Sequence, residues 1–378
     1  MKVKICFVLE YYFPHIGGAE TFFKNLVESL VKKGHDCFVV TSSVPGTDKI
    51  ERINGVEVRR VCVPRLWSRY WFTILSVPSV YKIAKDCDIL HTRTYNGAFP
   101  ACLVSLLLKK PAVITIFEVL PDLWKTLPGM NWFNAKLHEL SEKAAVGLPF
   151  DRYVCTSYYT RNQVRMLGID DKKLAVAYPG IDQELFRYHG EDGRLVRERL
   201  GLKGNFVYMY FGRPGFFKGV DVLLKAVPMI AKTIPGSMLV LILSKEPRGV
   251  YKRLLSIIKD LKIEDSLILL DSMRIEELVK YISCCDCVVL PSLSEGFGFT
   301  CVEACSIGKP VVASEVGSIP EVIFGKHVFI RPRSPEEVCG GVQSVYLGNA
   351  AFQPRKTFDW QECAEKHEKI YAGLLERM

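Results

Sequence analysis

The sequence predicts an α/β fold with two doubly wound domains, each a parallel sheet covered by helices on both faces. Short apolar runs alternate with longer amphipathic stretches along nearly the whole chain, which is typical of such sheets. The 378 residues, 49% of them hydrophobic and 24% charged, suffice for two separate cores. A turn-forming Tyr-Pro-Gly at 178–180 precedes a charged segment at 187–199 and marks the boundary. We expect domains at 1–178 and 179–358.

The elements of the first half follow from its apolar runs in chain order. Each run is short and ends at polar or turn-forming residues, as buried strands do. The first helix is expected at 19–33, because Leu26, Leu30 and Val31 share one face and Gly34 can end it. The predicted strands are 4–9, 37–41, 56–63, 89–91, 112–117 and 152–155, with helices between them.

The second half repeats this alternation. Its predicted strands are 206–211, 238–243, 267–270, 287–290, 310–313 and 328–330. The segment 117–133 in the first half does not fit the pattern, because it combines Pro121, Pro128 and Gly129 with two tryptophans and little periodicity. We predict a loop near the ligand cleft there.

Composition and cysteine use limit the class of protein. No run of 18 apolar residues occurs and the chain starts with a strand, so we expect a cytoplasmic protein, at most peripheral on the inner face of a membrane. The 13 cysteines lie mostly in apolar runs and are expected to be reduced and buried. A cluster at 284–305 lacks paired C-x-x-C spacing and a companion His pair, which favours packing over metal binding.

The positive charge is concentrated in the first half. Residues 1–180 hold 24 Lys and Arg against 16 Asp and Glu, so +8 of the net +9 lies there. Such an excess of positive charge can attract nucleic acid, an anionic membrane or an anionic acceptor. The alternative is a solvated basic surface with no binding role. The basic and aromatic segment 65–72 suits a membrane interface or stacking on sugars, and equally a loop packed on its own domain.

Three glycine-containing turns carry the candidate chemistry. The first, Gly17-Gly18, follows strand 4–9 and opens the first helix, so its backbone can approach a ligand closely. It is not a full G-x-G-x-x-G, and a dinucleotide interpretation fails. The second places Arg213 and Lys218, five residues apart, after strand 206–211, where two cations can clamp a diphosphate.

The third turn follows strand 287–290 and carries two acids eight residues apart. Glu295 lies in the turn and can accept hydrogen bonds from sugar hydroxyls, whereas Glu303 lies one helical turn inside the next helix and can reach a ribose. The first N–H groups of that helix, near Phe299 and Thr300, would face a diphosphate. The segment therefore predicts a nucleotide-sugar site.

Together these residues resemble the signature of the retaining glycosyltransferases of the GT4 type, which have the GT-B fold. The resemblance implies two Rossmann-like domains facing across a cleft, with the last helix, 360–375, returning to the first domain, so that about 359–378 packs there. It assigns Glu295 to the donor sugar, Glu303 to the ribose, and Arg213 and Lys218 to the diphosphate. Backbone groups of Gly298, Phe299 and Thr300 complete that pocket, and Met273 and Arg274 occupy the place of the base.

The acceptor side departs from the family pattern. Many members carry a His at the end of a first-domain strand, where this chain has Phe117 and Glu118. Glu118 is a polar contact or base for an acceptor hydroxyl, or a solvated carboxylate. His91 is expected at a strand end facing the cleft, in contact with donor or acceptor, or as a structural His. The D-x-D at 86–88 precedes its strand, so we expect no catalytic metal.

We therefore predict a hexosyltransferase that uses a nucleotide sugar, with UDP or GDP, as co-substrate without another cofactor. The acceptor is a lipid-linked glycan or a saccharide, an anionic membrane is a further partner of the first domain, and nucleic acid is not. The alternatives are a GT-B epimerase or phosphorylase, which needs no separate glycosyl acceptor, and a non-catalytic binding protein, which leaves Glu295 and Glu303 unexplained.

Overall fold

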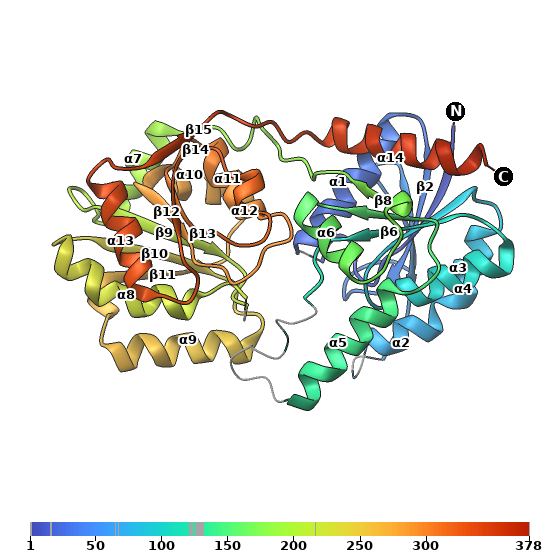
Figure 1. Ribbon diagram of the computed structural model, residues 1–378, viewed down its shortest axis with the longest axis horizontal. Helices are drawn as coiled ribbons and strands as arrows, with labels where there is room; N and C mark the ends of the chain where they lie inside the picture. The colour runs from blue at the N-terminus through green and yellow to red at the C-terminus, as the bar shows by residue number, and fades with distance from the viewer. Residues whose placement is uncertain are drawn as a thin grey trace. The chain divides into compact units, whose positions relative to one another are not determined.

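The chain folds into two compact units. The computed structural model describes residues 2–15, 17–64, 66, 68–120, 124, 132–215 and 217–377. Unit 1 comprises Met1–Gly180 together with Phe358–Met378, and unit 2 comprises Ile181–Thr357. Each unit has its own sheet and helices (Figure 1). The prediction of an α/β fold with two Rossmann-like parallel sheets is confirmed.

Unit 1 is built on an eight-stranded sheet in the order β3-β4-β2-β1-β5-β6-β7-β8. Neighbouring strands are parallel except β3 and β4, which form an antiparallel hairpin around Asn54 and Gly55, both at positive φ. The strands are β1 Lys4–Val8, β2 Asp36–Ser42, β3 Ile50–Ile53, β4 Val56–Val61, β5 Ile89–Arg93, β6 Ala112–Ile116, β7 Arg152–Cys155 and β8 Leu174–Val176. The helices are α1 Gly18–Lys32, α2 Ser68–Leu75, α3 Val77–Ala84, α4 Ala98–Leu108, α5 Trp132–Val146, α6 Tyr158–Met166 and α14 Trp360–Leu375, with a 3₁₀ turn at Asp171–Lys173.

Unit 2 is built on a seven-stranded sheet in the order β11-β10-β9-β12-β13-β14-β15, parallel except at β15. The strands are β9 Val207–Gly212, β10 Met238–Leu243, β11 Leu267–Asp271, β12 Cys287–Leu290, β13 Val311–Ser314, β14 Gly325–Ile330 and β15 Ala351–Gln353. The helices are α7 Gly190–Arg199, α8 Val220–Thr233, α9 Arg248–Leu261, α10 Ile275–Cys284, α11 Phe299–Ser306, α12 Ile319–Val322 and α13 Pro335–Tyr346, with a 3₁₀ turn at Glu264–Ser266.

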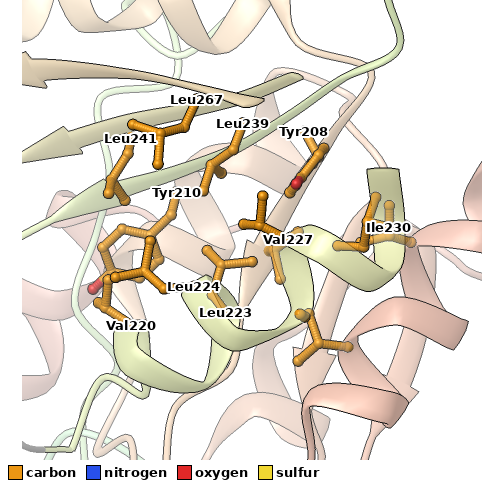
Figure 2. Close-up of a cluster of buried hydrophobic side chains, with 14 of the residues drawn as sticks. Tyr208, Tyr210, Val220, Leu223, Leu224, Val227, Ile230, Leu239, Leu241 and Leu267 are labelled. Carbon is orange, nitrogen blue, oxygen red and sulfur yellow. The ribbon is translucent and has the colours of Figure 1, made fainter. Parts of the chain in front are cut away.

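The core of unit 2 fixes α8 on the sheet. Val220, Leu223, Leu224, Val227 and Ile230 recur at helical spacing and are buried. They lie in one cluster with side chains of the three neighbouring strands β9, β10 and β11 (Figure 2). Because α8 starts directly after the β9 loop, this packing also fixes the position of that loop.

In both sheets the strand order reverses at one point. The chain winds outward from β1 through β2 and then returns to β5, and it winds outward from β9 through β10 and β11 and then returns to β12. Loops at the carboxyl ends of the strands on the two sides of such a reversal diverge, and ligands of open α/β sheets bind there. In unit 2 the reversal lies between β9 and β12, in unit 1 between β1 and β5.

The C-terminal helix α14 belongs to unit 1 and packs against α1. The chain leaves unit 1 after Gly180 and returns to it at Phe358. These two places lie close together within unit 1, because a Cβ on Gly180 would lie 2.3 Å from the backbone nitrogen of Trp360. The rings of Tyr178 and Phe358 also contact each other edge to face. This close approach requires a glycine at 180.

The cysteines are free thiols, all of them buried except Cys62. Burial raises the pKa of Cys285 to about 12 and that of Cys284 to about 11, which keeps both protonated at neutral pH. Within the described part of the chain no three His, Cys, Asp or Glu side chains gather in a way that could hold a metal ion. In the same residues, no helix is long and apolar enough to cross a bilayer.

Candidate functional site

A cation and a carboxylate meet at the strand-order reversal of unit 2. Lys218 lies in the loop after β9 and Glu295 in the loop after β12, 77 residues further on. The Lys218 ammonium donates a hydrogen bond to Oε1 of Glu295 over 2.7 Å. The two turns, which are far apart in the sequence, therefore lie together, as the resemblance implies.

The backbone holds these two loops together. Gly219 precedes α8 at φ +63°, and a Cβ there would lie 1.9 Å from the carbonyl oxygen of Pro291. The N–H of Leu293 donates to the carbonyl of Phe217 over 2.6 Å. Only glycine permits both the left-handed conformation and this close approach, so Gly219 sets the distance between the loops.

Glu295 is fixed from several sides. Its side chain is 9% exposed, and the Ser292 hydroxyl donates to Oε1 over 2.8 Å. Its backbone carbonyl accepts from the N–H and the hydroxyl of Ser318 at 2.9 and 3.1 Å. A Cβ on Gly317, at φ +58°, would lie 2.2 Å from the same carbonyl. Burial and, second, the Glu295 charge raise the pKa of the neighbouring Tyr210 phenol, which therefore stays protonated.

The first turn of α11 lies beside this pair. Gly298 is the N-cap of the helix at φ +84° and, as a glycine, offers no side chain to cap its N–H groups. A Cβ on Gly212, the last residue of β9, would lie 3.7 Å from the methyl group of Thr300, so the helix begins next to the end of β9. The N–H groups around Phe299 and Thr300 thus lie near the loop that carries Lys218, with the positive end of the helix dipole.

Glu303 is the second acid of the site and has a different environment. Its side chain is half-buried on α11, and no hydrogen bond or ion pair of its carboxylate occurs within the residues that the structure describes. Burial without a compensating partner raises its pKa to about 7. The two acids therefore differ: Glu295 is ion-paired, and Glu303 keeps its proton to a higher pH than a solvated carboxyl does.

Arg213, Met273 and Arg274 follow strands on the same side of the reversal as Lys218. Arg213 is exposed and follows β9 directly. Met273 and Arg274 follow β11, which is separated from β9 by β10, and the guanidinium of Arg274 lies 3.4 Å from Glu276. Neighbouring strands lie about 5 Å apart, so the strand that precedes these two residues is two strand spacings from β9.

The residues predicted in unit 1 lie near its own strand-order reversal. Gly17 is the N-cap of α1 with extended backbone, and Gly18 is its first residue. In the first turn of α1, Glu20 accepts from Arg93 over 2.8 Å. Glu118 follows β6 and is half-buried, and its charge contributes to raising the pKa of Tyr95, after burial and Glu142.

The prediction that His91 faces a ligand cleft is wrong. The strand β5 continues to Arg93, so His91 lies within the strand and is fully buried. Its Nδ1 lies 2.6 Å from the Tyr371 hydroxyl and its Nε2 lies 2.8 Å from that of Thr115. Burial, and second the nearby His367, lower its pKa well below 6.5, so it is a neutral core residue under α14.

Sequence reasoning missed the network that holds the segment after β6. Glu142 of α5 accepts from the Tyr95 hydroxyl over 2.9 Å and from the N–H of Leu120 over 2.8 Å. Tyr95 has φ +79°, a conformation that costs energy for a residue with a Cβ. The signal in the sequence is a pair of acids, Glu139 and Glu142, on the buried side of α5. Of the loop predicted at 117–133, residues 121–123 and 125–131 lie outside the described residues, as do Arg65 and Trp67 of segment 65–72.

Two protein families match the two units. Residues 16–185 match Glycosyltransferase Family 4, and residues 194–358 match Glycosyl transferases group 1. A glycosyltransferase of Methanocaldococcus jannaschii, described as uncharacterized, is 24% identical over the full length of both chains. A D-inositol 3-phosphate glycosyltransferase of Catenulispora acidiphila is 25% identical over 86% of this chain and 83% of its own.

Solved structures share the fold over the whole chain. Sucrose-phosphate synthase of Thermosynechococcus elongatus superposes with a TM-score of 0.81 at 19% identity, covering all of both chains. The Anabaena protein HepE, solved in complex with UDP and glucose, superposes with a TM-score of 0.75 at 18% identity, covering 98% of this chain and 100% of its own. At this identity the likeness establishes the fold.

Proposed function

The chain belongs to the group 1 glycosyltransferases of the GT-B type, and from this we propose that it moves a hexose-type sugar from a nucleoside diphosphate to an acceptor hydroxyl with retention at the anomeric carbon. Unit 2 binds the donor and unit 1 binds the acceptor. The observation that carries the proposal is the meeting of Lys218, Glu295 and the first turn of α11 at one strand-order reversal.

The diphosphate is the leaving group, and its negative charge grows as the bond to the sugar breaks. The Lys218 ammonium, the Arg213 guanidinium and the free N–H groups of α11 supply positive potential at the carboxyl ends of β9 and β12. Groups fixed in place before the reaction stabilise developing charge best. We therefore propose that these residues carry out the work that a metal ion performs in other enzymes, and that no metal or other cofactor is required.

The two acids take different parts of the donor. Glu295 is held by Ser292 and the Ser318 backbone, so its carboxylate can accept hydrogen bonds from sugar hydroxyls in a fixed orientation. Glu303, which has no described partner, can accept from two ribose hydroxyls. Met273 and Arg274, which follow a strand two strand spacings from β9, are proposed to contact the base.

Relatives limit the choice of the donor nucleotide, and the charge of the first half limits the choice of acceptor. HepE was solved with UDP and glucose, and a starch synthase with ADP and acarbose, which supports a nucleoside diphosphate donor. We propose UDP or GDP as the nucleotide. The excess positive charge of residues 1–180 favours a phosphate-bearing acceptor, either a lipid-linked glycan or a saccharide, at the inner face of a membrane in the cytoplasm. Glu118 is proposed to contact the acceptor hydroxyl.

Replacing either partner of the central pair tests the donor site. Lys218→Ala and Glu295→Ala are each expected to lower turnover by roughly 10²-fold or more, because each removes a fixed polar contact to the reacting part of the donor. Candidate sugar nucleotides are first screened by thermal stabilisation. Turnover is then measured as release of nucleoside diphosphate, and the anomeric configuration of the product by NMR.

Arg194→Ala is the matched control, since Arg194 forms an exposed ion pair with Glu198 on α7 of the same unit. It should leave turnover within twofold of the wild type. Near-normal turnover in both Lys218→Ala and Glu295→Ala contradicts the site. An inverted product contradicts retention, and epimerisation of the nucleotide sugar without any acceptor favours an epimerase.

A further inference from the structure

Helix α4 of unit 1 is apolar on both of its sides. Its inner side packs in the core of unit 1. Its outer side carries Phe99, Leu103, Leu106 and Leu107, which are 42 to 61% exposed. Their spacing places them along a single stripe of the helix. A surface helix of a globular domain is normally polar on its outer side, so this stripe indicates a partner.

The neighbouring helix α2 extends the apolar surface. Tyr70 and Ile74 are exposed one turn apart, and so are Trp71 and Leu75. The hydroxyl of Thr73 donates to the carbonyl of Asn96 over 3.2 Å, which holds α2 against the start of α4. Helices α2, α3 and α4 contact one another, and Tyr81 of α3 is exposed as well. We call the exposed side chains of these three helices the apolar face.

The three helices of the apolar face carry no acid, and the exposed Asp86 and Asp88 lie just beyond the end of α3. Neither 58–85 nor 89–117 contains an Asp or Glu, and Asp86 is the first acid after α3. Lys82, Lys85 and Lys109 are exposed, and no ion pair of theirs occurs in the described part of the protein. Lys110 donates to the carbonyls of Ala84 and Cys87 at 2.8 and 2.5 Å, which joins the C-terminal ends of α3 and α4 and gathers the lysines there.

We propose that the apolar face docks on an anionic membrane surface. The Leu, Ile, Phe and Trp side chains enter the interfacial layer while Lys82, Lys85 and Lys109 contact anionic headgroups. Helix α4 has 11 residues, too few to cross a bilayer, so it lies in the plane of the surface. The three helices carry a leucine stripe and cations but no acid of their own, and this combination matches lipid better than it matches nucleic acid, which offers no apolar layer to such a stripe. The inference deepens the proposed function. It rests on that function in one respect: the lipid-linked acceptor would lie in the membrane to which this face binds.

Vesicle flotation tests this inference. The wild-type protein should float with phosphatidylglycerol-containing vesicles, bind vesicles of phosphatidylcholine alone at least tenfold more weakly, and dissociate as salt is raised. The double variant Leu106→Glu with Leu107→Glu should lose at least tenfold in vesicle binding. Leu347→Glu is the control, because Leu347 is 60% exposed but belongs to unit 2, and it should bind vesicles as the wild type does.

Donor binding separates this inference from the proposed function. The double variant should keep the wild-type thermal shift with the donor nucleotide, because α4 takes no part in the donor site of unit 2. The inference is overturned if the wild type does not float with anionic vesicles, or if the double variant floats as the wild type does. It is also overturned if the wild type binds no vesicles but forms a concentration-dependent dimer, and the double variant is monomeric.

Discussion

At the scale of single residues, the two acids of unit 2 have different surroundings. Glu295 has a cation and a hydroxyl within hydrogen-bonding distance. Glu303 is half-buried with no described partner, and burial raises its pKa from 4.5 to about 7. The folded protein therefore holds a proton on Glu303 that the unfolded chain has released between pH 4.5 and 7.

Donor affinity should depend on pH through Glu303. Ribose hydroxyls donate to the ionised carboxylate, so donor binding favours loss of the proton. Affinity for a nucleotide sugar, whose diphosphate diester does not titrate near neutrality, should rise up to about tenfold per pH unit below pH 7 and level off above it. By the same linkage, the stabilisation of the free protein by this group is lost as pH rises through 7.

Titration calorimetry between pH 5.5 and 8.5 measures the donor affinity at each pH. The number of protons released on binding follows from the change in binding enthalpy between buffers of different ionisation enthalpy. Glu303→Gln cannot titrate and should give a flat profile with weaker binding throughout. An equally steep profile in Glu303→Gln would assign the titration to another group.

The sequence indicated the candidate site residues of unit 2 but not their partners. Arg213, Lys218, Glu295 and Glu303 were readable because each stands at a fixed distance from a strand or a glycine turn. The contacts of Glu295 with Ser292 and the Ser318 backbone come from loops that no local pattern pairs. His91 was misplaced because strand β5 runs two residues longer than its apolar run, which moved the side chain into the core.

At the scale of elements, Gly219 fixes the start of α8 against the β12 loop. Gly219→Ala is expected to destabilise unit 2 by about 3 kcal/mol or more, because φ +63° disfavours a Cβ and the added carbon would lie 1.9 Å from the Pro291 oxygen. The control Gly308→Ala also has positive φ, +83°, but meets nothing within 4 Å. It should cost about 1 kcal/mol.

Urea unfolding can be assigned to each unit, because the five tryptophans, at 67, 71, 124, 132 and 360, all belong to unit 1. Gly219→Ala should shift the circular-dichroism transition of unit 2 and leave the tryptophan-fluorescence transition unchanged. Equal effects of the two glycine variants would show that the contact with Pro291 does not set the loop.

The buried central strands were predictable from the sequence, and three strands at the edges of the sheets were not. The twelve predicted strands are all present, because central parallel strands are continuous apolar runs. The three strands that were missed, β3, β8 and β15, lie at sheet edges and are only half-buried or exposed. Their pairing depends on the neighbouring strand more than on their own composition, although Asn54-Gly55 was a hairpin signal for β3.

At the scale of the whole molecule, the chain starts and ends in unit 1. Tyr371 of α14 is fully buried, and its hydroxyl contacts His91 of β5. Tyr371→Ala is expected to destabilise unit 1 by about 3 to 5 kcal/mol, since it leaves a cavity and an unpaired His nitrogen. The midpoint of the tryptophan-fluorescence transition should move to a lower urea concentration, whereas the circular-dichroism transition of unit 2 should stay in place.

Lys369→Ala, an exposed position on the same helix, should change this transition by less than about 0.5 kcal/mol. An unchanged transition in Tyr371→Ala would mean that α14 contributes little to the stability of unit 1.

The overall architecture was predictable because alternation of strands and helices is a property of the whole sequence. The membership in the GT-B glycosyltransferases, indicated by the resemblance, is confirmed by the two family matches. Only the part of the apolar face within segment 65–72 was suggested by the sequence. The apolar run of α4 does not distinguish a core helix from a surface helix, and the fold shows that three of its four leucines are exposed.

The most direct test of the donor site is calorimetric titration of the wild type and of Lys218→Ala with the nucleotide sugar selected by the stabilisation screen. We predict one site per chain in the wild type and at least a tenfold weaker affinity in Lys218→Ala, with both unfolding transitions unchanged. Equal affinity in the two proteins would contradict the placement of the diphosphate beside Lys218 and Glu295.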